Sequence, residues 1–142
     1  MSYIEFDKVS KIYKMGEVEI KALDEVSFGI DKGEFVVILG ASGAGKSTIL
    51  NILGGMDTAT SGSVVVDEKD ISNATESELT DYRRFDIGFV FQFYNLVQNL
   101  TALENVELAV QLCKDHLDPK KILKRVGLDK RMNNSLILQF LI

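Results

Sequence analysis

The chain has 142 residues, 46% of them hydrophobic, and 16 basic against 21 acidic side chains give a net charge of −5. This length suits one ordinary domain with a real core, and the acidic balance argues against nucleic acid as a partner, because such surfaces usually carry a basic stripe. The lone Cys113 excludes an internal disulfide and fits a reducing compartment. No apolar run approaches the roughly 20 residues of a membrane span, and residues 1–7 lack a signal-peptide pattern, so we expect a cytoplasmic protein.

The first third of the chain alternates between apolar and polar residues. The alternation runs through Ile4 and Phe6, then Val18–Ala22, then Val26–Ile30, and predicts half-buried antiparallel strands. After a turn at Lys32-Gly33, the continuous apolar run Phe35–Leu39 predicts a fully buried strand.

A glycine-rich loop follows that run. It matches the phosphate-binding (Walker A) pattern G-x-x-x-x-G-K-[ST], between an expected strand and an expected helix, as that pattern requires, and it consists of Gly40, Ala41, Ser42, Gly43, Ala44, Gly45, Lys46, Ser47 and Thr48. Its N–H groups and the following helix N-terminus favour an anion. Lys46 would reach the β- and γ-phosphates, and the Ser47 hydroxyl would ligate Mg²⁺. The alternative, a glycine-rich turn with an incidental lysine, is disfavoured by the flanking elements, and the loop predicts binding of a nucleoside triphosphate.

Turn and capping signals divide the rest of the first half. The helix after the loop should end near Gly54-Gly55. The run Gly62–Val66 predicts a strand, and Asp67–Asp70 predicts a polar turn. The capping box Thr75-Glu-Ser-Glu78 predicts a helix through about Arg84.

The second half is expected to be mainly helical. The apolar run Ile87–Phe91 predicts one more buried strand, and a second capping box, Thr101-Ala-Leu-Glu104, predicts a helix. One face of that helix should be core, with Leu103, Val106, Val110 and Cys113. Asp118-Pro119 and Gly127 predict the start and end of a last helix.

The loop alone also fits a GTPase, a kinase or a motor. Together with Tyr13, with Gly62-Ser-Val-Val-Val-Asp67 and with Gly88-Phe-Val-Phe-Gln92-Phe-Tyr-Asn-Leu96, however, the chain resembles the nucleotide-binding domain of ATP-binding-cassette (ABC) transporters from residue 2 to about residue 132. It is most similar to the lipoprotein-release and macrolide-efflux branch, which has phrases like Lys21-Ala-Leu-Asp-Glu-Val-Ser-Phe28, Met56-Asp57 and Leu100-Thr-Ala-Leu-Glu-Asn-Val106.

The resemblance implies an α/β fold: an incomplete P-loop NTPase core with an N-terminal antiparallel β subdomain and part of the helical subdomain. It implies ATP and Mg²⁺ as ligands, with Tyr13 stacked on adenine and Gln92 beside Mg²⁺. It also implies a transmembrane permease subunit and a second nucleotide-binding subunit as partners, at the cytoplasmic face of the plasma membrane. The alternatives are a half-buried strand tyrosine at Tyr13 and a solvated glutamine at Gln92.

Four elements of the family are not found in this sequence: the signature Leu-Ser-Gly-Gly, the Mg²⁺-facing Asp, the catalytic Glu and the switch His. His116 does not stand at the switch position. We therefore expect residues 1–132 to be the N-terminal part of the domain and residues 133–142 to be an out-of-pattern tail from an interrupted reading frame. ATP binding with negligible hydrolysis is expected. A non-catalytic regulatory protein and an inactive remnant remain alternatives.

Overall fold

The computed structural model describes residues 2–92, 95–111, 113 and 115–135. The chain divides into two compact units, and the boundary falls between Ile87 and Gly88. The first unit contains a sheet and two helices, α1 (Lys46–Leu53) and α2 (Glu76–Phe85). The second contains α3 (Ala102–Val110), α4 (Pro119–Arg125) and a 3₁₀ turn, η1 (Asp129–Arg131). Among the described residues, no helix has the length and apolar character needed to cross a bilayer.

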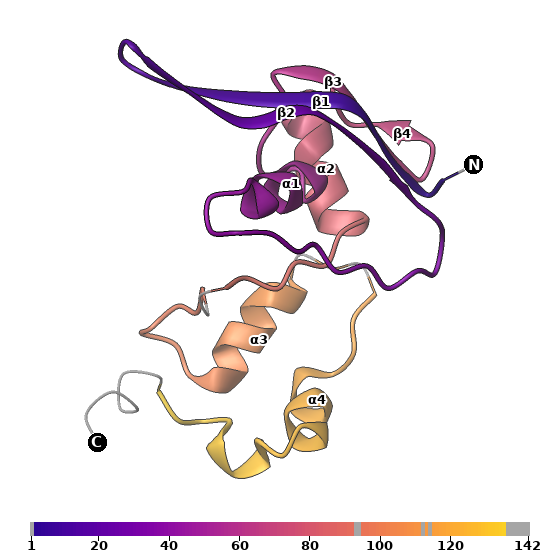
Figure 1. The fold of residues 1–142 in the computed structure, drawn as a ribbon. Coiled ribbons are helices and arrows are strands. Elements are labelled where there is room, and N and C mark those ends of the chain that lie inside the picture. Colours follow the sequence, from indigo (N-terminus) through magenta and orange to yellow (C-terminus); the bar gives the residue numbers. More distant parts are fainter. Residues whose placement is uncertain (1, 93–94, 112, 114, 136–142) are drawn as a thin grey trace. The chain divides into compact units, whose positions relative to one another are not determined.

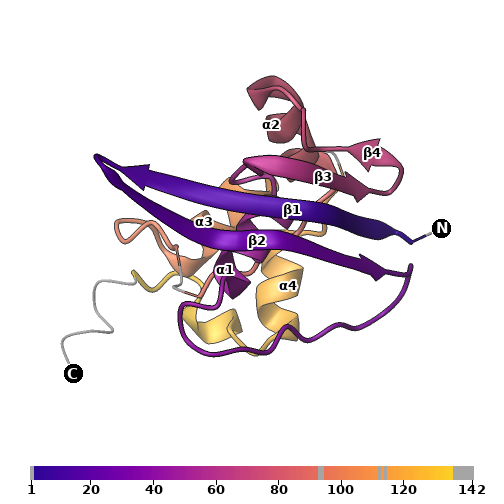
Figure 2. The ribbon, with the colours of Figure 1, turned by 45° about the horizontal axis from the view of Figure 1, so that its top comes forward.

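The sheet of the first unit is antiparallel, in the order β2-β1-β3-β4, and Figure 2 shows its strands side by side. Its strands are β1 (Ile4–Met15), β2 (Val18–Ile30), β3 (Ser61–Val66) and β4 (Lys69–Asp70). β1 and β2 form a long hairpin with Met15 opposite Val18, and Gly16 in its turn has φ +63°. The antiparallel strands expected from the alternation are thus confirmed.

β2 differs from the prediction because Val18–Ala22 and Val26–Ile30 belong to one continuous strand. The register shifts along this hairpin, and Glu25 there has φ +47°. The Ser10 hydroxyl accepts the Glu25 N–H at 2.9 Å and so satisfies a donor that the ladder leaves unpaired. A bulge bonded in this way bends a strand without ending it.

Both helices of the first unit lie on the same side of the sheet (Figure 1) and share its core. The core residues come from strands and helices alike: Phe6, Val9, Leu23, Ile49, Ile52, Val64, Val66, Ile71, Leu79 and Tyr82. The predicted helix ends are confirmed. Gly54 caps α1, and Gly55 has φ +64°, while Thr75 and Glu78 form the capping box of α2.

The prediction of buried strands at Phe35–Leu39 and Ile87–Phe91 is wrong for the structure, in which neither segment is a strand. A strand requires a hydrogen-bonded neighbour, and no described residue pairs with either segment in a sheet. Several of their apolar side chains are therefore exposed, with Phe35 at 94%, Leu39 at 86% and Val90 at 94%. Ile38 and Ile87 are partly buried and pack against the core.

The second unit forms its helices where the capping signals predict them. Thr101 and Glu104 make the second capping box, and the Asp118 side chain caps α4. Gly127, with φ +78°, follows the end of α4. Cys113 is a correction: it is exposed, not part of a core, because α3 ends at Val110 and the helical face does not extend to it. Most of the expected tail, residues 136–142, lies outside the described residues.

Candidate nucleotide-binding site

The glycine-rich loop folds as its sequence predicts. Gly43 and Gly45 have φ of +80° and +83°, in the left-handed region that favours glycine. Gly45 is also the N-cap of α1, and as a glycine it has no side chain that could cap the helix. The first N–H groups of α1 have no partner within the helix, so they remain available to an anion at this end.

Close packing adds a second requirement at Gly45. A Cβ there would lie 2.5 Å from the Ala22 carbonyl oxygen and 2.7 Å from Leu23 Cδ2, both on β2. At Gly40 a Cβ would lie 3.2 Å from Ala44 Cβ. The loop is thus a cradle of bare backbone pressed against the sheet.

Lys46 brings a positive charge to the loop. Its Nζ donates to the carbonyl oxygens of Gly40 at 2.9 Å and Ala41 at 2.6 Å, so the ammonium lies over the start of the loop. Ser47 is exposed in the first turn of α1. Bare backbone N–H groups, a helix N-terminus, an ammonium and a hydroxyl are the groups that bind a polyphosphate and its Mg²⁺, so the residues present fit the ligands that the sequence predicts.

Tyr13 lies in the same unit as the loop. Its hydroxyl donates to Asp57 Oδ2 at 2.7 Å. Burial raises the pKa of Tyr13, and the hydrogen bond to Asp57 raises it further, whereas a bond with the Thr48 side chain acts to lower it. Because Thr48 is the last residue of the loop, its effect on the pKa of Tyr13 indicates that the tyrosine lies near this end of the loop.

Asp57 also binds Lys11, whose Nζ contacts Asp57 Oδ1. Burial alone would raise the pKa of Asp57, but hydrogen bonds from Lys11, Tyr13 and the Thr58 N–H, with the Lys11 charge, together lower it. Asp57 is therefore a carboxylate held ionised beside a cation and a phenol.

Gln92 belongs to the other unit, where it is exposed at a bend. Its role as a Mg²⁺ ligand with Ser47 stays a prediction. His116 is exposed, and its Nδ1 lies 3.3 Å from the Leu117 carbonyl oxygen. No cluster of His, Cys, Asp or Glu among the described residues could hold a metal ion.

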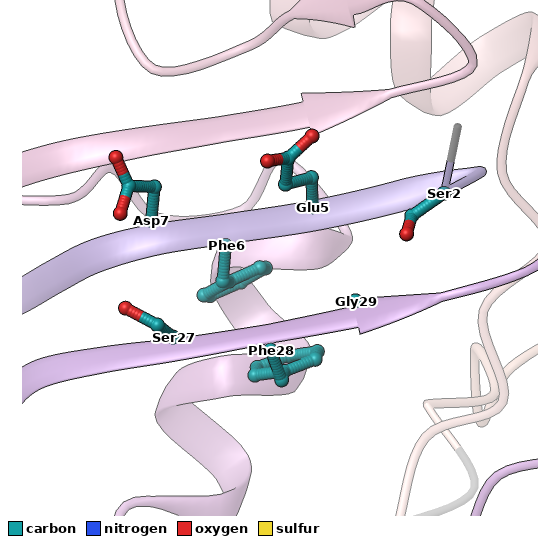
Figure 3. A pocket seen from close by; sticks show the side chains of 7 residues that line it. All are labelled: Ser2, Glu5, Phe6, Asp7, Ser27, Phe28 and Gly29. Atoms are coloured by element: carbon teal, nitrogen blue, oxygen red, sulfur yellow. The ribbon is translucent and has the colours of Figure 1, made fainter.

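A separate hollow of about 520 Å³ lies over β1 and β2 (Figure 3) and is lined by Ser2, Glu5, Phe6, Asp7, Ser27, Phe28 and Gly29. Phe6 and Phe28 stack with their centroids 4.5 Å apart, on the opposite side of β1 from the Glu5 and Asp7 carboxylates. This is the ordinary alternation of a half-buried strand, and it brings none of the loop residues to the hollow.

Sequence reasoning missed Lys11 and Asp57 as members of the site. Lys11 could have been found from the sequence, because residues two apart on a strand share a face and Lys11 stands two positions before Tyr13. No sequence pattern points to Asp57, because its partner Tyr13 is 44 positions away along the chain.

The ABC transporter family model matches residues 23–139. The chain is 42% identical over 139 residues to the macrolide export ATP-binding/permease protein MacB of Mannheimia succiniciproducens, covering 94% of this chain and 22% of that protein. It is 53% identical over 105 residues to the ABC transporter ATP-binding protein MJ0796 of Methanocaldococcus jannaschii, covering 74% of this chain and 45% of the relative.

A solved structure of the MJ0796 cassette, described as a dimer in a post-hydrolysis state bound to ADP and Pi, matches with a TM-score of 0.81 and 43% identity. The matched region covers 93% of this chain and 60% of the MJ0796 chain in that structure. The fold is thus that of a P-loop NTPase in part. The chain belongs to the ABC transporter family, and it spans about 22% to 60% of the length of these relatives.

Proposed function

We propose that this chain binds Mg-ATP as the nucleotide-binding part of an ABC transporter. The observation that carries the proposal is the Gly40–Thr48 loop, closed against β2 at Gly45 with Tyr13 beside Thr48. Lys46 would hold the β- and γ-phosphates and the loop N–H groups would surround them. Tyr13 would stack on adenine, which is worth roughly 1–3 kcal/mol for a base on an aromatic ring.

Mg²⁺ would neutralise phosphate charge, held by the Ser47 hydroxyl and, in this proposal, by the Gln92 amide oxygen. Neither side chain activates a water molecule. The residues assigned to the site therefore bind and orient the nucleotide, and none of them serves as a base for the attacking water. We therefore expect this set of residues to bind ATP with negligible turnover.

The proposed partners are a transmembrane permease subunit and a second nucleotide-binding subunit, at the cytoplasmic face of the plasma membrane. MacB is named as an ATP-binding/permease protein, and the MJ0796 cassette is described as dimeric. This similarity supports export in the lipoprotein or macrolide branch.

Calorimetric titration with Mg-ATP and Mg-GTP tests nucleotide binding. Lys46→Ala should weaken ATP about 10- to 150-fold, because hydrogen bonds to a charged group contribute about 1.5–3 kcal/mol. Lys14→Ala is the matched control: it removes an exposed ammonium from the Lys14–Glu19 pair and should change nothing. Tyr13→Ala should weaken ATP and reduce the preference for ATP over GTP.

The titrations also separate the alternatives. Equal affinity for ATP and GTP, or no effect of Lys46→Ala, would favour another class of P-loop protein. Thermal melts with and without Mg-ATP identify an inactive remnant. A ligand that binds only the folded chain should, at 100 times its Kd, add about 2.7 kcal/mol to the free energy of unfolding. A chain that shows no cooperative melt in either condition would be an inactive remnant.

A further inference from the structure

Asp57 engages both of its carboxylate oxygens with β1. Oδ2 accepts from the Tyr13 hydroxyl at 2.7 Å, and Oδ1 contacts Lys11 Nζ. The Thr58 N–H also donates to Oδ1, at 2.8 Å. The Asp57 side chain is 24% exposed and that of Lys11 is 12% exposed, so this pair is sheltered from solvent far more than an ordinary surface ion pair.

Lys11 is placed against the tyrosine ring by these bonds. Its Nζ lies over the ring, 5.0 Å from the centroid, and it donates to the Thr58 carbonyl oxygen at 2.7 Å. A cation over an aromatic face is attracted by the ring quadrupole. One face of Tyr13 is therefore occupied by Lys11, so a flat ligand could stack only on the other face.

The segment that carries Asp57 is tied to α1. The backbone N–H groups of Met56 and Asp57 both donate to the Asn51 carbonyl oxygen, at 2.9 and 3.2 Å. Because α1 is the helix whose N-terminus is part of the phosphate loop, Asp57 links the tyrosine to the same rigid element as the loop.

We infer that Asp57 is a positioning residue for the nucleobase: it fixes the Tyr13 ring relative to the phosphate loop and holds Lys11 on the face away from the base. This inference rests on the proposed function. Asp57 itself touches no part of the nucleotide in this arrangement. It acts by removing the rotational freedom that Tyr13 would otherwise lose on stacking.

A role confined to stability would give a different result. Losing a hydrogen bond that only joins β1 to the segment after α1 would lower the free energy of unfolding and leave the affinity of the folded chain unchanged. A positioning role instead predicts a loss for ligands with a base and none for a bare polyphosphate. Mg-ATP and Mg-tripolyphosphate therefore form the diagnostic pair.

The experiment measures both affinities by calorimetry on the full chain and its variants. Asp57→Ala should weaken Mg-ATP about 3- to 10-fold, the range for one hydrogen bond, and leave Mg-tripolyphosphate within twofold. Tyr13→Phe removes the hydroxyl and keeps the ring, so it should show the same selective loss, and the double variant should be no weaker than either. Asp57→Asn keeps an oxygen acceptor and should recover most of the ATP affinity.

Asp24→Ala is the control, because it removes an exposed aspartate from the Lys21–Asp24 pair on β2. Equal losses for both ligands in Asp57→Ala or Tyr13→Phe, or no loss for ATP in these two variants, would overturn the inference. If Asp57→Ala does not fold, Tyr13→Phe still decides it, because that variant keeps the aspartate and the ring and should lose affinity for Mg-ATP alone. Failure of the proposed function has a separate signature: the unaltered chain would bind neither ligand.

Discussion

Gly45→Ala tests the claim that the phosphate loop is held against the sheet by the absence of a side chain. Gly45 has φ +83°, and an alanine Cβ there would lie 2.5 Å from a carbonyl oxygen of Ala22 and 2.7 Å from Leu23 Cδ2. Both contacts are far inside van der Waals separation. Leu23 is 3% exposed and part of the core, so it has little room to move away.

Two costs add at this position. The left-handed conformation costs a residue with a Cβ about 1–2 kcal/mol, and overpacking a well-packed site costs about 1–3 kcal/mol more. We expect Gly45→Ala to lower the free energy of unfolding by about 2–5 kcal/mol, a large part of the about 5–15 kcal/mol that typical domains possess. Affinity for Mg-ATP should fall as well, because the loop must separate from β2.

Gly43→Ala is the matched control, with φ +80° and nothing within 4 Å of the added Cβ. It should cost only the conformational part, about 1–2 kcal/mol. Urea denaturation of both variants, followed by calorimetry with Mg-ATP, provides the comparison. If the two variants are equally stable, the close approach of the loop to β2 does not constrain it, and the packing argument is refuted.

Two further predictions concern the end of α1 and hydrolysis. Burial, then the charges of Asp86 and Tyr3, raises the pKa of Tyr82 to about 12, and its hydroxyl donates to the Leu53 carbonyl oxygen at 2.7 Å. The stability that this neutral phenol contributes is present below its unfolded pKa near 10 and is lost as pH rises toward about 12. The urea midpoint should therefore fall less steeply above pH 10 in Tyr82→Phe than in the unaltered chain. Parallel plots of urea midpoint against pH for the two proteins would contradict this. Steady-state phosphate release by the full chain should not exceed background, whereas a Lys46-dependent rate within the usual about 1–10³ per second would refute the prediction of negligible turnover.

Local signals predicted the elements that depend on local chemistry. The capping boxes at Thr75 and Thr101 begin helices as expected, because an N-cap side chain and its N3 partner satisfy backbone donors within four residues of each other. The phosphate loop was predictable for a similar reason, since Gly43 and Gly45 are required by backbone conformation at their own positions.

Strand formation failed as a prediction where it depends on residues elsewhere in the chain. The apolar run Phe35–Leu39 has strand composition, yet composition alone supplies no hydrogen-bonded neighbour. β3, of similar character, is a strand because β1 lies beside it, with Phe6 opposite Val64. The difference between these two runs is one of pairing, which their own residues do not encode.

The side chains around Tyr13 include residues, Lys11 and Asp57, that belong to no sequence motif. The loop and the aromatic residue are separated along the chain, and a motif states only which residue types stand at which spacing. Asp57 links the aromatic residue to α1, because its carboxylate accepts from Tyr13 and its backbone N–H donates to Asn51. These bonds depend on where α1 ends, and Gly54 and Gly55 stand at that end. Tyr82 and Arg83 of α2 then bond to the carbonyl oxygens of Leu53 and Gly55. In the proposed complex, the spacing between base and phosphate would therefore depend on the turn after α1 as well as on the loop before it. Substitutions at that turn should alter recognition of the base before they alter binding of phosphate.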